Sequence, residues 1–193
     1  MNRDIANAIA GTTLASAQGH WYRHTWHGVK EPTGSTGGGR WGPEHGFPVI
    51  YLGRPVDSVT VEAYRRLVDP VEGMTGELVG PRALFTLDVD VDNLLDLREP
   101  DHLAAVGLDQ AALIGPWVPC VRVARAAHQL GLHGVLAPAA TEVGLTLALF
   151  EQHLPAGQMP HVVSRTMWSG LPSDPRTPSQ RLAQISRPSG PAV

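Results

Sequence analysis

The apolar residues recur along the chain with two different periods, one typical of helices and one typical of strands. Ile5, Ile9 and Leu14 follow helical spacing, which predicts an N-terminal helix over residues 4–17. A second helix is predicted to begin with Asp57 or Ser58 as its capping residue and to include Val61, Tyr64 and Leu67. Helices are also predicted within residues 100–113 and over residues 117–130, where Gly131 ends the helix.

Short apolar or alternating runs between Gly and Pro predict strands. Residues 84–91 (LFTLDVDV) alternate between apolar and polar residues, as expected for a half-buried strand. Further strands are predicted at residues 20–26, 47–52, 135–137, 146–150 and 161–167, with loops at 27–39 and 69–81. Because helices and strands do not alternate regularly, we predict an α+β fold, with small mixed β-sheets flanked by helices.

The chain has 193 residues, a length typical of one domain. From Leu171 onward Pro, Ser and Arg dominate and the apolar periodicity fades. We therefore expect the domain to occupy residues 1–170, and residues 171–193 to form either a surface-wrapping or a disordered tail. The apolar N-terminal helix is a candidate surface for a homodimer or another partner.

Composition restricts the partners and the compartment. Apolar residues make up 42%, charged residues 17%, and the formal net charge is −3. This mild acidity argues against direct binding of nucleic acid or of an anionic membrane, although it permits a local basic pocket. No apolar run reaches the ~18–20 residues of a membrane span. Asp4 and Asn7 weaken a faint likeness to a signal peptide, so the protein is predicted to be cytoplasmic.

Cysteine and histidine offer no metal site. The single cysteine, Cys120, lies in an apolar run and is interpreted as a buried structural thiol. None of the nine histidines has the tight spacing of a metal-binding motif. We therefore expect neither a disulfide within the chain nor a bound metal.

The candidate chemistry lies between residues 37 and 62. Arg40 follows three glycines, Tyr51 ends an apolar strand, and Glu62 lies in the first turns of a helix, each eleven residues after the last. A guanidinium, a phenol and a carboxylate brought together could hold a phosphorylated substrate and stabilise a developing positive charge.

Taken singly, each residue also has an ordinary interpretation. Arg40 could be an exposed loop residue, Tyr51 an amphipathic rim residue, and Glu62 a carboxylate favoured by the helix dipole. Arg23, in an aromatic strand, either faces solvent or points into a charged site. Composition and spacing alone do not identify a substrate.

Several segments in this order resemble the RES domain, the toxin of RES–Xre toxin–antitoxin pairs. They are GGGRWG with Arg40 and Trp41, PVIYLG with Tyr51, TVE with Glu62, then GVLAPAAT and LTLALF. The resemblance covers about residues 20–170 and implies an ADP-ribosyltransferase-like fold. It also implies consumption of NAD as a substrate rather than a cofactor, and an Xre-type antitoxin partner.

The resemblance also implies roles for individual residues. Arg23 and Arg40 would bind the NAD phosphates, with His24 and Trp41 nearby. Tyr51 would pack beside the nicotinamide or its ribose. Glu62 would stabilise the ribosyl cation as nicotinamide leaves, or orient the attacking group.

Two positions depart from the family pattern. Gly42 replaces the Asn that often follows Trp, and Ala139 stands where the family serine should align. Alanine has no hydroxyl, and Thr141 is the nearby candidate to replace it. Three alternatives stay open: NAD cleavage as a toxin, ADP-ribosyl transfer or N-glycosidic cleavage on another NAD-derived substrate, and a non-catalytic RES-like binding module.

Overall fold

A computed structural model describes residues 3–186 of the chain. The helices are α1 (Arg3–Ala10), α2 (Val56–Leu67), α3 (Pro100–Ala105), α4 (Gln110–Ile114), α5 (Val118–Gln129) and α6 (Pro178–Ile185). The strands are β1 (Leu14–Trp26), β2 (Ser35–Gly39), β3 (Gly42–Arg54), β4 (Arg82–Asp96), β5 (Gly134–Pro138), β6 (Leu145–Phe150) and β7 (His161–Trp168). Short 3₁₀ turns lie at Gly76–Leu78, Glu151–His153 and Ala156–Gln158.

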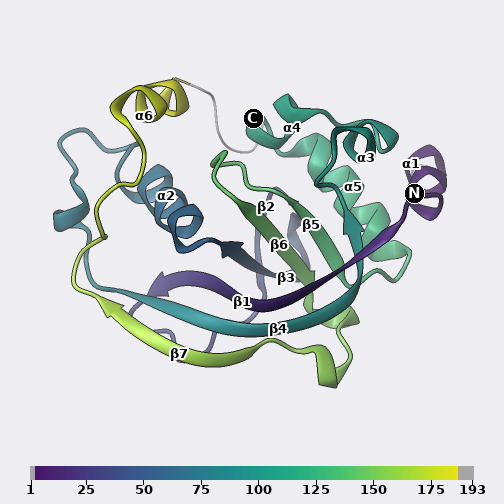
Figure 1. The fold of residues 1–193 in the computed structure, drawn as a ribbon, viewed down its shortest axis with the longest axis horizontal. Helices are drawn as coiled ribbons and strands as arrows, with labels where there is room; N and C mark the ends of the chain where they lie inside the picture. The colour runs from purple at the N-terminus through teal and green to yellow at the C-terminus, as the bar shows by residue number, and fades with distance from the viewer. Residues whose placement is uncertain (1–2, 187–193) are drawn as a thin grey trace.

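The strands form one mixed sheet in the order β1-β3-β6-β5-β4-β7, with β2 added on β3. Strand β1 pairs with β4 along most of its length and with β3 at Tyr22 and Gly53, so it connects two parts of the sheet. Strands β4 and β5 are parallel, and the other pairs are antiparallel. In Figure 1, β1, β4 and β7 run together along the lower side, and β3, β6 and β5 cross above them.

Apolar side chains fill both faces of the crossed strands. One cluster lies under α1 and α3–α5 and includes Trp41 and Phe150. A second lies between β1 and β4 and the strands that cross them, and includes Trp21 and Phe85. A third joins α2 to the C-terminal segment through Tyr64. The α+β class is therefore confirmed, as are all the predicted strands and the helices at 100–113 and 117–130.

The predicted N-terminal helix over residues 4–17 was wrong in its second half. Helix α1 ends at Ala10, and β1 begins at Leu14. The residues after Leu14 pair with the far end of β4, so strand pairing overrides their helical spacing. The apolar residues of α1 pack inward against α5, with Ile9 only 2% exposed.

Two local predictions also need correction. The predicted loop at 27–39 contains β2, because its glycines pair with β3 in a hairpin. Helix α2 has Pro55 at its N-cap and no side-chain cap from Asp57 or Ser58. The Ser58 hydroxyl instead lies 3.4 Å from the Thr141 hydroxyl.

Residues 171–186 pack onto the rest of the chain. Arg176 and Gln184 are buried, and a capping box formed by Thr177 and Gln180 begins α6. This segment therefore wraps the surface beside α2, while the remainder of the predicted tail, 187–193, lies outside the described residues. No helix within residues 3–186 has the length and apolarity needed to cross a bilayer.

Candidate active site

Arg40, Tyr51 and Glu62 come from three neighbouring elements. Arg40 lies in the turn between β2 and β3, Tyr51 in β3, and Glu62 in α2. Glu62 acts electrostatically on Arg40, and both Arg40 and Arg23 act on Tyr51. The fold thus brings the predicted cation, phenol and carboxylate into one electrostatic neighbourhood.

Arg40 is held firmly rather than projecting from a mobile loop. Its Nη1 donates to the carbonyl oxygens of Ala112 at 2.9 Å and Gly115 at 3.1 Å, and its Nη2 donates to Ile114 at 3.4 Å. These carbonyls are at the C-terminal end of α4, where a cation satisfies unpaired acceptors. Burial lowers the pKa of Arg40, and Cys120 and Glu62 oppose that effect.

The glycines beside Arg40 make room for Tyr51. A Cβ at Gly39 would lie 2.6 Å from the Tyr51 hydroxyl, and one at Gly42 would lie 2.7 Å from Val49. The Tyr51 oxygen accepts a hydrogen bond from the Trp41 backbone N–H at 3.1 Å. Burial raises the pKa of Tyr51, so its hydroxyl keeps its proton and can donate it to a ligand.

Glu62 and Trp41 have opposite exposures. Glu62 is exposed on α2, while its neighbours Val61 and Ala63 are completely buried and fix the rotation of the helix. The Trp41 side chain is only 1% exposed and belongs to the apolar core. The Glu62 side chain is therefore accessible to a ligand, and the Trp41 side chain packs in the apolar core beneath the turn that carries Arg40.

Arg23 and His24 are successive residues of β1, so their side chains point to opposite faces. Arg23 Nη1 donates to the Thr33 carbonyl at 2.9 Å. Burial lowers its pKa, and Glu151 opposes that effect.

The surroundings of His24 are cationic. Burial first, then Arg82, Arg66 and Arg23, lower the pKa of His24 to about 3. Its ring is therefore neutral at physiological pH, and its Nδ1 lies 3.3 Å from Arg82 Nη2. Sequence analysis missed Arg66 and Arg82. Arg66 could have been found, because it lies four residues after Glu62 on one helix.

Ala139 and Thr141 lie in the turn between β5 and β6, and each is 2% exposed. The Thr141 hydroxyl contacts Ser58 of α2 and also bonds the Val143 backbone. It thus joins the turn to α2, and among the described residues it forms no hydrogen bond with Glu62.

Two further residues hold this turn. Arg65 Nη1 donates to the Ala140 carbonyl at 2.6 Å, and Gln184 Nε2 donates to the Thr141 carbonyl at 2.7 Å. Gln184 comes from α6, so the C-terminal segment supports the turn beside the helix that carries Glu62. The sequence gives no signal of this role, because Gln184 is one polar residue in a segment that has no clear apolar periodicity.

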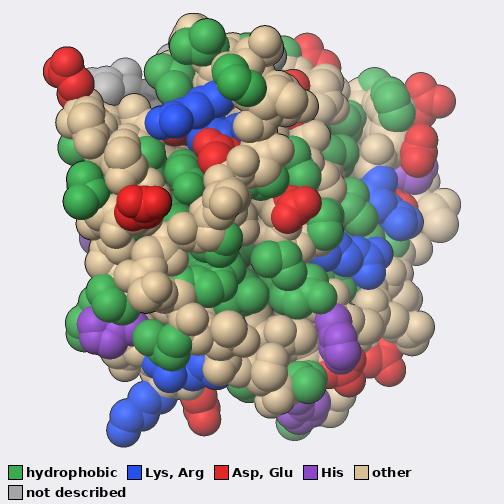
Figure 2. Space-filling view, turned by 60° about the vertical axis from the view of Figure 1, so that its left-hand side comes forward, with side chains coloured by type: hydrophobic (Ala, Val, Ile, Leu, Met, Phe, Trp, Pro, Cys, Tyr) green, Lys and Arg blue, Asp and Glu red, His purple; other side chains and the backbone are tan. Residues whose placement is uncertain are grey.

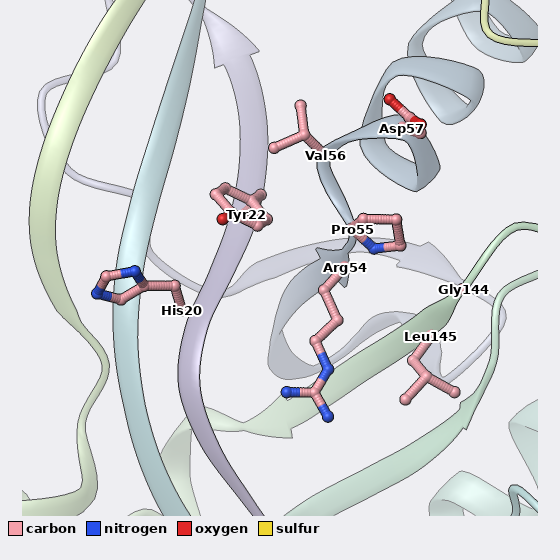
Figure 3. Close-up of a pocket in the computed structure, with 8 residues that line it drawn as sticks. All are labelled: His20, Tyr22, Arg54, Pro55, Val56, Asp57, Gly144 and Leu145. Atoms are coloured by element: carbon pink, nitrogen blue, oxygen red, sulfur yellow. The ribbon is translucent and has the colours of Figure 1, made fainter.

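A cavity of about 630 Å³ lies beside the start of α2 (Figure 3). It is lined by His20, Tyr22, Arg54, Pro55, Val56, Asp57, Gly144 and Leu145. None of the predicted site residues lines it, so cavity shape and candidate chemistry indicate different places. We place the candidate site by chemistry, because Arg40 interacts electrostatically with both Tyr51 and Glu62. Among residues 3–186, no group of three His, Cys, Asp or Glu side chains could hold a metal.

Comparison with known proteins gives a consistent picture. The family model for the RES domain matches residues 13–184. Proteins from Mycobacterium bovis and Mycobacterium tuberculosis, named NAD(+) phosphorylase MbcT, are 37% identical over 123 residues, which is 63% of this chain and 66% of theirs. The matched region thus spans just under two thirds of these relatives.

The fold has a solved counterpart. The crystal structure of the M. tuberculosis MbcT–MbcA toxin–antitoxin complex contains a chain that matches with a TM-score of 0.76 and 28% identity. The match covers 96% of this chain and 98% of the other. The likeness therefore includes the strands and helices that carry Arg23, Arg40, Tyr51 and Glu62.

Proposed function

The chain belongs to the RES domain family, and we propose from this that it cleaves the bond between nicotinamide and ribose in NAD, as a toxin-like phosphorylase or glycohydrolase. The observation that carries the proposal is the electrostatic grouping of Arg40, Tyr51 and Glu62. The relatives named NAD(+) phosphorylase support the choice of substrate.

The charges suit this reaction. When the bond from C1′ to the nicotinamide nitrogen breaks, its electron pair stays with nicotinamide, which leaves neutral. The ribose then carries positive charge, which the exposed Glu62 carboxylate stabilises. Arg40 and Arg23 hold the substrate's phosphates, and Tyr51 lies beside the reacting ribose.

The acceptor completes the balance of the reaction. If a phosphate oxygen bonds to C1′, the products are nicotinamide and a 1-phosphorylated ADP-ribose. If water attacks instead, the products are ADP-ribose, nicotinamide and a proton. Phosphorolysis is favoured here because the named relatives are phosphorylases.

A second candidate is a non-catalytic or redirected RES-like module. The observation that favours it is the missing hydroxyl at Ala139, together with the use of the Thr141 hydroxyl by Ser58. In that case NAD would bind without turnover, or an ADP-ribosyl group would be transferred to another acceptor.

The test is NAD turnover by purified protein with and without phosphate, read by product mass. We expect Glu62→Gln to lower turnover by about 10²–10³-fold, the usual effect of removing one electrostatic stabiliser. Glu72→Gln removes another exposed carboxylate, from a loop, and should leave the rate unchanged. NAD binding with no turnover in the wild type would favour the second candidate.

We further propose an Xre-type antitoxin as partner, with no direct binding of nucleic acid or membrane. The solved counterpart is a toxin–antitoxin complex, which supports the antitoxin. A reaction that consumes NAD needs an NAD-containing compartment, which supports a cytoplasmic location. Co-purification with an antitoxin encoded beside this chain, and loss of turnover in that complex, would test the pairing.

A homodimer is also proposed, but α1 is a poor surface for it because its apolar residues pack inside. Figure 2 shows hydrophobic side chains gathered across the middle of the face where β1 and β7 end in Figure 1. Trp26 is 58% exposed, Met167 48% and Leu78 67%. Measurement of the molar mass in solution tests whether a second copy covers such a surface.

A further inference from the structure

A group of basic side chains lies where α2 passes over β1 and β4. Arg82 of β4 pairs in register with Trp26 of β1, and His24 pairs with Leu84. His24 and Arg82 therefore project from the same face of the sheet, and their side chains meet at 3.3 Å. Arg66 of α2 acts electrostatically on both residues.

The arginines of this group have no ion-pair partner in the part of the chain that the structure describes, although Glu62 lies one turn from Arg66 on α2. Within residues 3–186, neither Arg66 nor Arg82 forms an ion pair with a carboxylate. The Arg82 Nε is buried, and no atom of residues 3–186 accepts a hydrogen bond from it. Burial and Arg66 both lower the pKa of Arg82, which shows that its charge lies in an unfavourable setting.

Such a group is unfavourable unless an anion completes it. Two guanidinium groups without a carboxylate repel each other, and an unpaired buried donor costs about 1–3 kcal/mol. A phosphate oxygen supplies both the missing acceptor and the missing negative charge. Because its Nδ1 faces the Arg82 guanidinium, which only donates, the neutral His24 ring carries its proton on Nε2. It thereby adds an uncharged donor.

The group also lies beside the proposed reaction centre. Arg66 follows Glu62 by four residues, one turn along the same face of α2. His24 directly follows Arg23 in β1, but its side chain points to the other face of the sheet, so the connection to the reaction centre is through α2 and Glu62. A phosphate bound by Arg66 would therefore lie about one helical turn from Glu62, the residue proposed to act on the ribose.

We propose that Arg66, Arg82 and His24 form a subsite for a phosphate group at the edge of the NAD site. The inference rests on the proposed function for the identity of the ligand. The phosphate comes either from free inorganic phosphate, the acceptor of the reaction, or from the diphosphate of the dinucleotide. As acceptor, its oxygen forms the bond to C1′ while the bond to nicotinamide breaks and nicotinamide takes the electron pair.

The test uses two variants and a matched control. Arg66→Gln and Arg82→Gln each remove one positive charge and keep a hydrogen-bonding side chain. Arg125→Gln makes the same change at an exposed position of α5. Binding of inorganic phosphate and of ADP-ribose is measured by calorimetry, which does not depend on turnover, and KM is measured separately for phosphate and NAD.

We expect Arg66→Gln and Arg82→Gln to weaken binding of one phosphate source about 10–100-fold relative to Arg125→Gln, since a hydrogen bond to a charged group is worth about 1.5–3 kcal/mol. Weaker binding of inorganic phosphate alone assigns the subsite to the acceptor. Weaker binding of ADP-ribose alone assigns it to the dinucleotide. Wild-type affinity for both ligands in both variants would overturn the subsite.

These outcomes are separable from those of the proposed function. If the wild type binds phosphate or ADP-ribose through these arginines but does not turn over NAD, the subsite stands and the reaction is wrong. If NAD turns over and both variants keep wild-type affinity and KM, the reaction stands and the subsite is wrong. Because Arg66 is exposed, Arg66→Gln decides the matter even if Arg82→Gln does not fold.

Discussion

Two groups of arginines near α2 differ in whether carboxylates of the protein pair with them. Arg176 lies in the C-terminal segment, its side chain is 1% exposed, and it forms ion pairs with Asp69 at 2.7 Å and Asp174 at 2.8 Å. It also donates to Gln184 at 3.1 Å. Arg66, an exposed residue of α2, and Arg82 of β4 form no ion pair within residues 3–186.

The pKa shifts of the two groups have opposite signs. Burial lowers the pKa of Arg176, but its bonds to Asp174 and Asp69 outweigh burial and raise it overall. The pKa of Arg82 is lowered, by burial and by Arg66. The first arrangement is complete without a ligand, and the second lacks an anion. Pairing, rather than burial alone, therefore distinguishes a structural arginine from one available to a substrate.

The largest expected effect is on the structural side of the comparison. Arg176→Met should lower the free energy of unfolding by about 3–5 kcal/mol, because it leaves Asp174 without its ion-pair partner and Asp69 with only the half-exposed Arg181. Urea denaturation measures this change. The slope of the free energy of unfolding against urea concentration should equal that of the wild type, as expected if both unfold in two states.

Arg125→Met is the control for that variant, because Arg125 is exposed on α5, and its effect should stay within about 0.5 kcal/mol. A loss for Arg176→Met no larger than the control's would mean that the ion pairs contribute little. The C-terminal segment would then be held by its apolar contacts, of which Leu171 is the most buried.

The paired cluster also shows why the tail was hard to predict. Residues 171–186 contain few apolar residues, so periodicity gave no reason to place them on the domain. Their order depends on long-range polar contacts, such as Gln184 with Thr141 and Arg176 with Asp69. Strands such as β6 were predicted correctly because their own apolar pattern specifies burial.

The site was predictable in part for the same reason. Arg40, Tyr51 and Glu62 were found because motif and spacing mark them. The bonds of Arg40 to α4 connect residues more than 70 positions apart and leave no local pattern. Arg82 was missed because its role depends on the pairing of β1 with β4, which brings it against His24.

A smaller effect is expected on the pH dependence of stability, through His24 in the group of unpaired arginines. The pKa of His24 is about 3 in the folded protein, against an ordinary value of 6.5. Between these values the unfolded chain binds more protons, so stability is retained above pH 6.5 and lost as the pH falls toward 3. The expected slope approaches about 1.4 kcal/mol per pH unit.

Denaturation at a series of pH values measures this slope. His24→Asn should reduce it between pH 6.5 and 4, whereas His45→Asn, at an 89% exposed side chain, should not. His128 has its pKa lowered by burial and by His153, so part of the slope should remain in His24→Asn. A wild-type slope in that variant would mean that His24 is not held neutral by burial and by its basic neighbours.

The smallest effect on stability is expected for a substitution of Arg82. This variant tests whether unpaired arginines differ from the paired Arg176. Arg82→Gln removes a cation that repels Arg66 and keeps a donor for His24, so the free energy of unfolding should change by less than about 1 kcal/mol or rise. Inorganic phosphate should stabilise the wild type, since a ligand that binds only the folded state shifts unfolding by mass action, and it should stabilise Arg82→Gln less. Urea denaturation with and without phosphate measures both quantities. A loss of 3–5 kcal/mol, as expected for Arg176→Met, would show that Arg82 is structural, and the distinction between paired and unpaired arginines would fail.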